Sequence, residues 1–185
     1  RESIERVQSA ITNSGYEYPH TKSVINLAPA DVKKAGPAFD LPIALGVLLG
    51  TRAIESSITK ELIVVGELAL DGRVRPVNGI LSMAIAAREK GFKAMIVPLE
   101  NVREAAVVED LEVFGVGSLT QAASFLSGKL ALESTYVDID KMLEEASVYD
   151  VDFSDVKGQE TVKRALTIAA AGGHNILMIG PPGSG

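Results

Sequence analysis

Apolar side chains recur at helical spacing along much of the chain and predict a series of amphipathic helices. The first runs from Glu2 to Asn13, with four apolar side chains on one face. The same spacing predicts further helices over residues 79–90, 101–108, 118–126 and 160–171. The segment from Leu41 to Leu49 is apolar on nearly all sides, so we expect a buried helix there. Asp40 precedes it as the expected N-cap.

Runs of β-branched and aliphatic residues between these helices predict strands. They cover residues 23–28, 62–70, 73–77, 94–97, 111–116 and 176–179. The dipeptide Asp71-Gly72 is a hairpin signal that joins two of them. From Lys90 onward strand and helix alternate, which is typical of an α/β fold.

The apolar periodicity weakens between Ser127 and Asp150, where charge rises. We therefore expect a front domain over residues 1–128, a linker over 129–150 with one helix at 138–146, and a new unit over 151–185. With 46% hydrophobic residues among 185, the chain can bury a core.

Charge and composition narrow the function classes. The formal net charge of -6 argues against attraction of this stretch to nucleic acid or anionic membranes. The chain has no cysteine, and its two histidines, His20 and His174, match no zinc spacing. Because no apolar run reaches about 18 residues and the start is not a signal peptide, we expect a soluble cytoplasmic protein without a membrane partner.

The last ten residues carry the most specific pattern. An apolar run ends at Gly180, and Gly180 and Gly185 have the G-x-x-x-x-G spacing of a phosphate-binding loop. Glycines suit such a loop because its backbone N–H groups must turn toward phosphate oxygens, where a Cβ would block the approach. The expected nucleotide-binding residues of this loop are Gly180, Pro181, Pro182, Gly183, Ser184 and Gly185.

The segment before this loop resembles the start of an AAA+ ATPase domain, in particular the Mg-chelatase-related branch. The resemblance rests on residues 155–159, 163–166 and 169–185. It implies that Val156 and Gly158 lie against the adenine and that ATP and Mg²⁺ bind in the full-length protein. The P-loop lysine, the metal-binding hydroxyl and the Walker B acid are absent from this stretch, so we expect residues 1–185 alone to bind neither.

The first 128 residues resemble a different module, the proteolytic domain of Lon, and imply its fold, of the ribosomal protein S5 domain 2-like class. Residues 35–40 match the Lon nucleophile segment and residues 76–83 match the lysine segment. Ala38 stands where the serine should be, and Leu81 and Met83 occupy both lysine positions. A Ser–Lys dyad needs a hydroxyl and an amine, so we expect no catalytic residue here and disfavour a Lon-type peptidase.

A degenerate Lon-like domain followed by an AAA+ module resembles the YifB/ComM family. That resemblance implies an ATP-driven homo-oligomeric ring, a hexamer, with DNA branch migration in natural transformation as the function of its best-known member. DNA contact would lie in regions outside this chain. The front domain would be a non-catalytic interaction or regulatory module. A magnesium chelatase-type ATPase subunit is the alternative.

Other candidate sites are weaker. The triplet Asp150, Asp152 and Asp155 lacks the spacing of a Ca²⁺ loop. The pairs Lys33-Lys34 and Arg73/Arg75 could touch phosphates, although solvated faces are the simpler interpretation. Two structural expectations remain. Ala38 lies near Leu81 and Met83, whose side chains fill the former dyad site. Residues 176–185 are poorly ordered or pack unusually, with the apolar run folding back onto the front domain.

Overall fold

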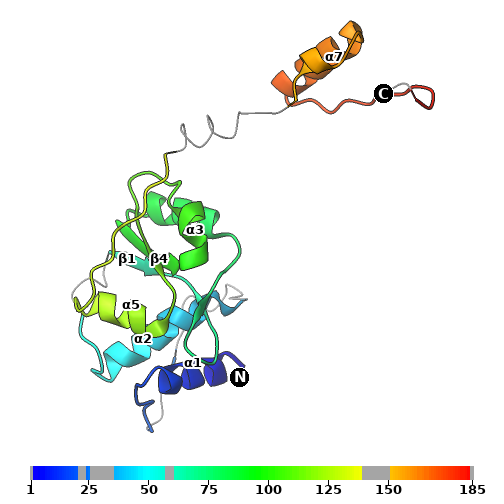
Figure 1. Ribbon diagram of the computed structural model, residues 1–185. Coiled ribbons are helices and arrows are strands. Elements are labelled where there is room, and N and C mark those ends of the chain that lie inside the picture. The colour runs from blue at the N-terminus through cyan, green and yellow to red at the C-terminus, as the bar shows by residue number, and fades with distance from the viewer. Residues whose placement is uncertain (1, 21–23, 26–35, 57–60, 139–150, 184–185) are drawn as a thin grey trace. The chain divides into compact units, whose positions relative to one another are not determined.

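The computed structural model describes residues 2–20, 24–25, 36–56, 61–138 and 151–183 (Figure 1). The chain divides into two compact units, Arg1–Ile139 and Asp140–Gly185, called here the front unit and the second unit.

The front unit is built on a parallel sheet of three strands in the order β1-β4-β5. These strands are β1 (Leu62–Val64), β4 (Ala94–Pro98) and β5 (Glu112–Val116). Leu62 pairs with Ala94, which in turn pairs with Glu112. Helices connect the parallel strands, as parallel pairing requires, and the α/β class expected from the sequence is confirmed.

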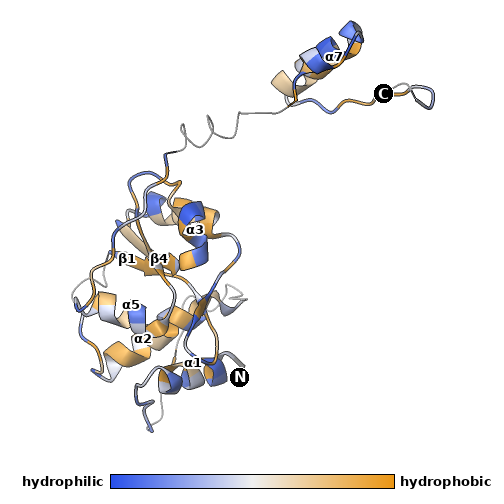
Figure 2. Cartoon of the chain, in the orientation of Figure 1, coloured by the Kyte–Doolittle hydropathy of each residue, from blue (hydrophilic) through white to orange (hydrophobic). Residues whose placement is uncertain are grey.

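Both faces of the sheet are covered, so alternate strand residues enter two apolar clusters. One cluster joins Ile96 and Val116 to α1 (Glu2–Asn13), α2 (Asp40–Gly50) and α5 (Leu119–Leu126). The other joins Met95, Val97 and Val113 to α3 (Ile80–Glu89) and α4 (Val102–Ala105). Figure 1 shows α3 on one side of β4 and α2 and α5 on the other, and Figure 2 shows α2 and the strands in mostly hydrophobic colours.

The apolar run 62–70, expected as one strand, is divided in two by Gly66. After β1, the short strand β2 (Glu67–Leu68) pairs antiparallel with β3 (Val74–Arg75). A Cβ at Gly66 would lie 3.0 Å from side-chain atoms of Leu41 and of Val74. Glycine therefore allows the close approach of α2 at the point where the chain leaves one sheet for the other.

The Asp71-Gly72 hairpin is confirmed, and its turn is packed rather than free. Gly72 has a φ of 83°, and a Cβ there would collide with the Ser14 side chain. The Gly72 carbonyl accepts the Leu119 N–H at 2.8 Å, at the start of α5. Ser118 is the N-cap of α5, as expected, because its hydroxyl accepts the Gln121 N–H at 3.1 Å. The hairpin turn thus joins α1 to α5.

Two helix predictions need correction. Asp40 is not the N-cap of α2: Phe39 precedes the helix, and the Asp40 carboxylate bonds to α1 instead. A single turn of 3₁₀ helix (Pro37–Phe39) leads into α2. The helix expected over 101–108 is shorter, since a 3₁₀ turn (Leu99–Asn101) precedes the four residues of α4.

The second unit contains a 3₁₀ turn (Phe153–Asp155) and the helix α7 (Glu160–Ala171), whose bounds match the prediction. The strand expected over 176–179 is not formed. These four apolar side chains are exposed, from 43% at Ile176 to 89% at Ile179. A strand needs a neighbour to pair with, and the described residues of this unit supply none.

Some predictions fall outside the described residues. These are the strand at 23–28 apart from Val24 and Ile25, the helix at 138–146 apart from Asp138, and the residues Lys33, Lys34, Asp150, Ser184 and Gly185. Val24 and Ile25 are in no strand. The division into residues 1–128, 129–150 and 151–185 stays a prediction.

Candidate functional site

Ala38, which the sequence resemblance predicts to occupy the Lon serine position, lies in the 3₁₀ turn before α2. Two backbone bonds fix this turn against the strand junction: Gly66 N–H donates to the Ala38 carbonyl at 2.9 Å, and Leu41 N–H donates to the Gly66 carbonyl at 3.0 Å. Gly36, just before the turn, has a φ of 116°, which favours glycine. The half-buried Ala38 methyl packs against the cluster that contains Val77 and Ile80. This position offers a methyl group where a nucleophile would stand.

Leu81 and Met83 lie at the start of α3, which a buried amide holds in place. Asn101 Oδ1 accepts the Val77 N–H at 2.9 Å, and Asn101 Nδ2 donates to the Val77 carbonyl at 3.0 Å. Glu104 Oε1 accepts the Leu81 N–H at 3.1 Å, and its Oε2 accepts from Asn101 Nδ2 at 3.2 Å. The first turn of α3 therefore already has a carboxylate acceptor.

Leu81 and Met83 are 37% and 36% exposed, and the expectation that they fill a former dyad site stays a prediction. Ala38 packs against the same cluster as Ile80 and Val77, the neighbours of Leu81 in the lysine segment. The approach of Ala38 to Leu81 or Met83 stays a prediction. None of these three side chains carries a group that attacks or accepts a proton.

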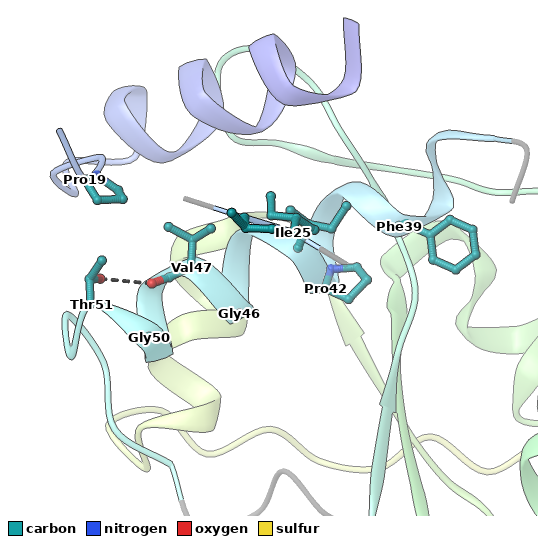
Figure 3. A pocket seen from close by; sticks show the side chains of 10 residues that line it. Pro19, Ile25, Phe39, Pro42, Gly46, Val47, Gly50 and Thr51 are labelled. Atoms are coloured by element: carbon teal, nitrogen blue, oxygen red, sulfur yellow. Dashed lines mark hydrogen bonds between the residues drawn. The ribbon is translucent and has the colours of Figure 1, made fainter. Parts of the chain in front are cut away.

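A groove of about 570 Å³ runs along the outer face of α2, beside the Ala38 turn (Figure 3). Phe39 and Pro42 lie toward one end and Pro19 and Thr51 at the other, with glycines and aliphatic side chains between them. The Thr51 hydroxyl is the side-chain polar group of the lining and donates to the Val47 carbonyl at 3.0 Å. The described residues that line the groove therefore offer no acid, base or activated nucleophile for hydrolysis.

In the second unit, the predicted nucleotide-binding residues lie in two segments. Gly183 has a φ of 84° and Gly158 a φ of 72°, and a Cβ at either would meet open space. Both glycines thus take backbone conformations that L side chains rarely adopt. Gly180, Pro181 and Pro182 are exposed, and so is Val156, at 46%. The apolar parts of the two segments are not buried against each other.

The acidic and basic candidates are engaged locally. Asp152 caps the turn at Phe153 by accepting the Ser154 N–H at 2.8 Å, and this backbone hydrogen bond lowers the Asp152 pKa. Asp155 accepts the Asp152 N–H, completing a capping box. Arg73 and Arg75 pair with Asp71 and Glu67. Hydrogen bonds from Arg73, the backbone bond first, lower the Asp71 pKa.

The described residues contain no group of three or more His, Cys, Asp or Glu side chains that could hold a metal ion. None of their helices has the length and apolar character needed to cross a membrane.

The burial and the hydrogen-bond partners of two polar side chains, Asp40 and Asn101, were not foreseen from the sequence. Asp40 is buried and bonded to Ser3 and Arg6, 37 and 34 residues earlier. Asn101 is buried and bonded to Val77, 24 residues earlier. Asp40 lies between the apolar Phe39 and Leu41, a pattern that signals a buried polar contact, whereas Asn101 follows the charged Glu100 and carries no such signal. Only the fold reveals the partners of both side chains.

Family models match both units of the chain. The model described as "Subunit ChlI of Mg-chelatase" matches residues 1–101, and the model described as "Magnesium chelatase, subunit ChlI" matches residues 152–185. Together they cover the Ala38 turn, the start of α3 and the glycine-rich segment.

Curated relatives are similar over the whole chain. Competence protein ComM of Haemophilus influenzae is 39% identical and the uncharacterized protein YifB of Escherichia coli 45% identical, each over 186 residues that span all of this chain. The chain spans 36% of the length of each of these relatives. A Lon protease of Methanosarcina barkeri is 32% identical over 104 residues, which is 55% of this chain and 13% of that protein. With both family models matched and this similarity along its full length, the chain belongs to the YifB/ComM family of magnesium chelatase-like proteins.

Proposed function

We propose that this chain is the front part of an ATP-driven AAA+ protein, and that residues 1–128 form a non-catalytic interaction or regulatory module with a Lon-protease-like fold. The observation that carries the module's role is the methyl group of Ala38, held by two backbone bonds in the turn where a Lon-type nucleophile would stand. The exposed alkyl and thioether side chains at positions 81 and 83 supply no base.

The nucleotide part of the proposal rests on the glycines of the second unit. The left-handed backbone of Gly183 suits a loop whose amides face phosphate oxygens, and the same conformation at Gly158 suits a close backbone approach to a base. In the longer protein, Gly180 to Gly185 would hold the phosphates, and Val156 and Gly158 the adenine. Mg²⁺ bound with ATP would neutralise phosphate charge there. Residues 1–185 alone bind Mg-ATP weakly or not at all.

The first test uses the longer protein and measures ATP hydrolysis. Gly183→Val places a β-branched residue at positive φ and is expected to lower the rate at least about tenfold, since a misplaced loop loses phosphate contacts. Gly46→Ala in α2, where a Cβ meets open space, is the matched control and keeps the parental rate. Unchanged hydrolysis by Gly183→Val would contradict the proposed loop.

The second test measures peptide hydrolysis by the front unit within the intact chain. The parent is expected to stay at the background rate, because no hydroxyl–amine pair is present at positions 38, 81 and 83. The double variants Ala38→Ser/Leu81→Lys and Ala38→Ser/Met83→Lys examine whether the backbone keeps the dyad geometry. Hydrolysis by the parent would overturn the non-catalytic role.

A magnesium chelatase subunit is the second candidate, favoured by the description of the family model over residues 1–101. The two candidates differ in substrate. The similarity to a competence protein favours DNA, with branch migration by a hexameric ring of the longer protein. Stimulation of ATP hydrolysis by branched DNA would support the motor, and magnesium insertion into a porphyrin with partner subunits would support the chelatase.

A further inference from the structure

The carboxylate of Asp40 is buried at the junction of two helices and receives hydrogen bonds from one of them. Its side chain is 1% exposed. Oδ2 accepts from Arg6 Nε at 2.9 Å, and Oδ1 accepts from Ser3 Oγ at 2.6 Å. Both donors belong to α1, so the charge at the start of α2 is satisfied by a helix more than thirty residues earlier in the chain.

The apolar contact between these helices does not define a single position by itself. Val7, Ala10 and Ile11 are the buried side chains of α1, and they pack in the cluster that holds Leu41 and Ala44 of α2. Apolar packing is non-directional, so the aliphatic stripe alone does not fix the position of α1 along α2. The C-terminal end of α1 is also bonded to the hairpin, where Asn13 Nδ2 donates to the Leu70 carbonyl at 2.7 Å, whereas its N-terminal half is bonded to Asp40. A buried ion pair with hydrogen-bond geometry is satisfied in only one arrangement.

The position of α1 is linked to the Ala38 turn through the same residue. Asp40 directly follows the turn Pro37–Phe39, and its neighbours Ala38 and Leu41 bond to Gly66 at the end of β1. The turn is therefore held on one side by the backbone hydrogen bonds to Gly66 and on the other by the hydrogen bonds that the Asp40 side chain accepts from α1. Moving Arg6 by one helical turn would leave the Asp40 charge buried without its partner.

We propose that the Arg6–Asp40 ion pair is a registry lock, which selects one docking position of α1 on α2 and thereby fixes the path of the Ala38 turn. Its role is specificity of packing rather than net stability, because the cost of desolvating two charges offsets much of their attraction. Asp40 is a positioning residue and takes no part in chemistry.

The experiment replaces the pair by apolar residues of similar volume in the double variant Arg6→Met/Asp40→Leu. The chain contains no cysteine, so spin labels can be attached through Gln8→Cys on α1 and Glu89→Cys at the end of α3, both exposed positions of the front unit. Electron-spin distance measurements then report where α1 lies, and urea unfolding reports stability. The control is Glu160→Leu/Lys163→Met, which removes an ion pair on α7 of the second unit.

The parent and the control are expected to give one narrow distance distribution. The double variant is expected to keep its urea midpoint or raise it, while its distribution widens at least about twofold or gains a second peak displaced by about 5 Å, one helical turn. Ser3→Ala, which leaves the ion pair intact, keeps the narrow distribution. An unchanged narrow distribution in the double variant overturns the proposal. So does a large fall of its urea midpoint, which would make the pair a simple stabiliser.

Discussion

The two units bury their apolar side chains to very different extents. In the front unit, strands and helices enclose two clusters, and residues such as Leu48, Met95 and Val113 are inaccessible to solvent. In the second unit, Ala169 is the buried hydrophobic residue among those described, while four consecutive apolar residues from Ile176 are exposed. The orange segment of the tail in Figure 2 has the composition of a core strand without its packing.

The difference shows what apolar composition can and cannot do. A run of aliphatic residues is buried only where several elements surround it, and one helix with one extended segment cannot enclose a core. The front unit has a sheet covered on both faces. The apolar face of α7 and residues 176–179 instead need packing partners that the described part of the second unit does not provide.

The largest expected effect contrasts one leucine from each unit. Leu48→Ala removes a fully buried side chain and should lower the free energy of unfolding by about 2–5 kcal/mol. Leu177→Ala changes a side chain that is 83% exposed and should alter it by less than about 0.5 kcal/mol. Urea unfolding of the chain measures both. Similar effects of the two changes would remove the contrast between the units.

A second prediction sharpens the contrast inside the front unit, between tight and open glycines. A Cβ at Gly115 of β5 would collide with the Val102 side chain, so Gly115→Ala should cost about 1–3 kcal/mol of stability. A Cβ at Gly46 in the middle of α2 meets open space, so Gly46→Ala should gain about 0.5–1 kcal/mol. Thermal and urea midpoints that move in the same direction for both variants would disagree with this packing.

A third prediction concerns the buried amide that holds the start of α3. Asn101→Ala leaves the Val77 N–H and carbonyl without their side-chain partner and should cost about 1–3 kcal/mol in urea unfolding. The exposed Asn78, close by in sequence, is the matched control, and Asn78→Ala should change stability by less than about 0.5 kcal/mol. An equal, small effect at both positions would mean that the amide does not hold α3.

The smallest expected effect on stability comes from two exposed aspartates, one in each unit, whose pKa values are shifted in the same direction. The pKa values of Asp71 in the front unit and Asp152 in the second should both lie below the usual aspartate value in a carboxyl NMR titration. A lowered folded pKa contributes stability above the unfolded pKa and loses it as pH falls through the folded pKa. Both groups are exposed to solvent, so solvent screening keeps this contribution small.

Arg73→Ala tests the cause of the first shift. The variant keeps the backbone N–H that bonds to Asp71 and removes only the guanidinium, so the Asp71 pKa should rise part of the way to its usual value. The Asp152 pKa should not move. A full return of the Asp71 pKa would show that the side chain, rather than the backbone bond, is the main cause.

Local signals in the sequence were sufficient for much of the fold. The Asp71-Gly72 turn, the Ser118 cap and the bounds of α7 depend on residues a few positions apart, and all three are found in the structure. The errors arise where the local structure depends on contacts with residues that are distant in the sequence. The sequence around Asp40 predicts an N-cap, but in the structure its carboxylate is bonded to Arg6 of α1. Residues 176–179 have the composition of a strand, but no neighbouring strand among the described residues pairs with them.

The side-chain chemistry at positions 38, 81 and 83 follows from the sequence, but the surroundings of these residues do not, and their match to the Lon dyad stays a prediction. The missing hydroxyl and amines at positions 38, 81 and 83 can be read directly from the sequence. The exposure of Leu81 and Met83, and the Asn101 and Glu104 side chains behind the start of α3, depend on how α3 packs against α4. The identities of these residues are therefore enough to argue against a Ser–Lys hydrolysis, but they do not predict which side chains are exposed around the site.

The packed hairpin turn at Gly72 has a practical consequence for engineering the protein. A surface turn is normally where an epitope tag, a fluorophore or a circular-permutation break is placed. Here an insertion between Asp71 and Gly72 would separate the Gly72 carbonyl from the Leu119 N–H and push against Ser14, loosening two helices at once. Glu109 and Asp110 are exposed in the connection from α4 to β5 and provide a better place for foreign sequence.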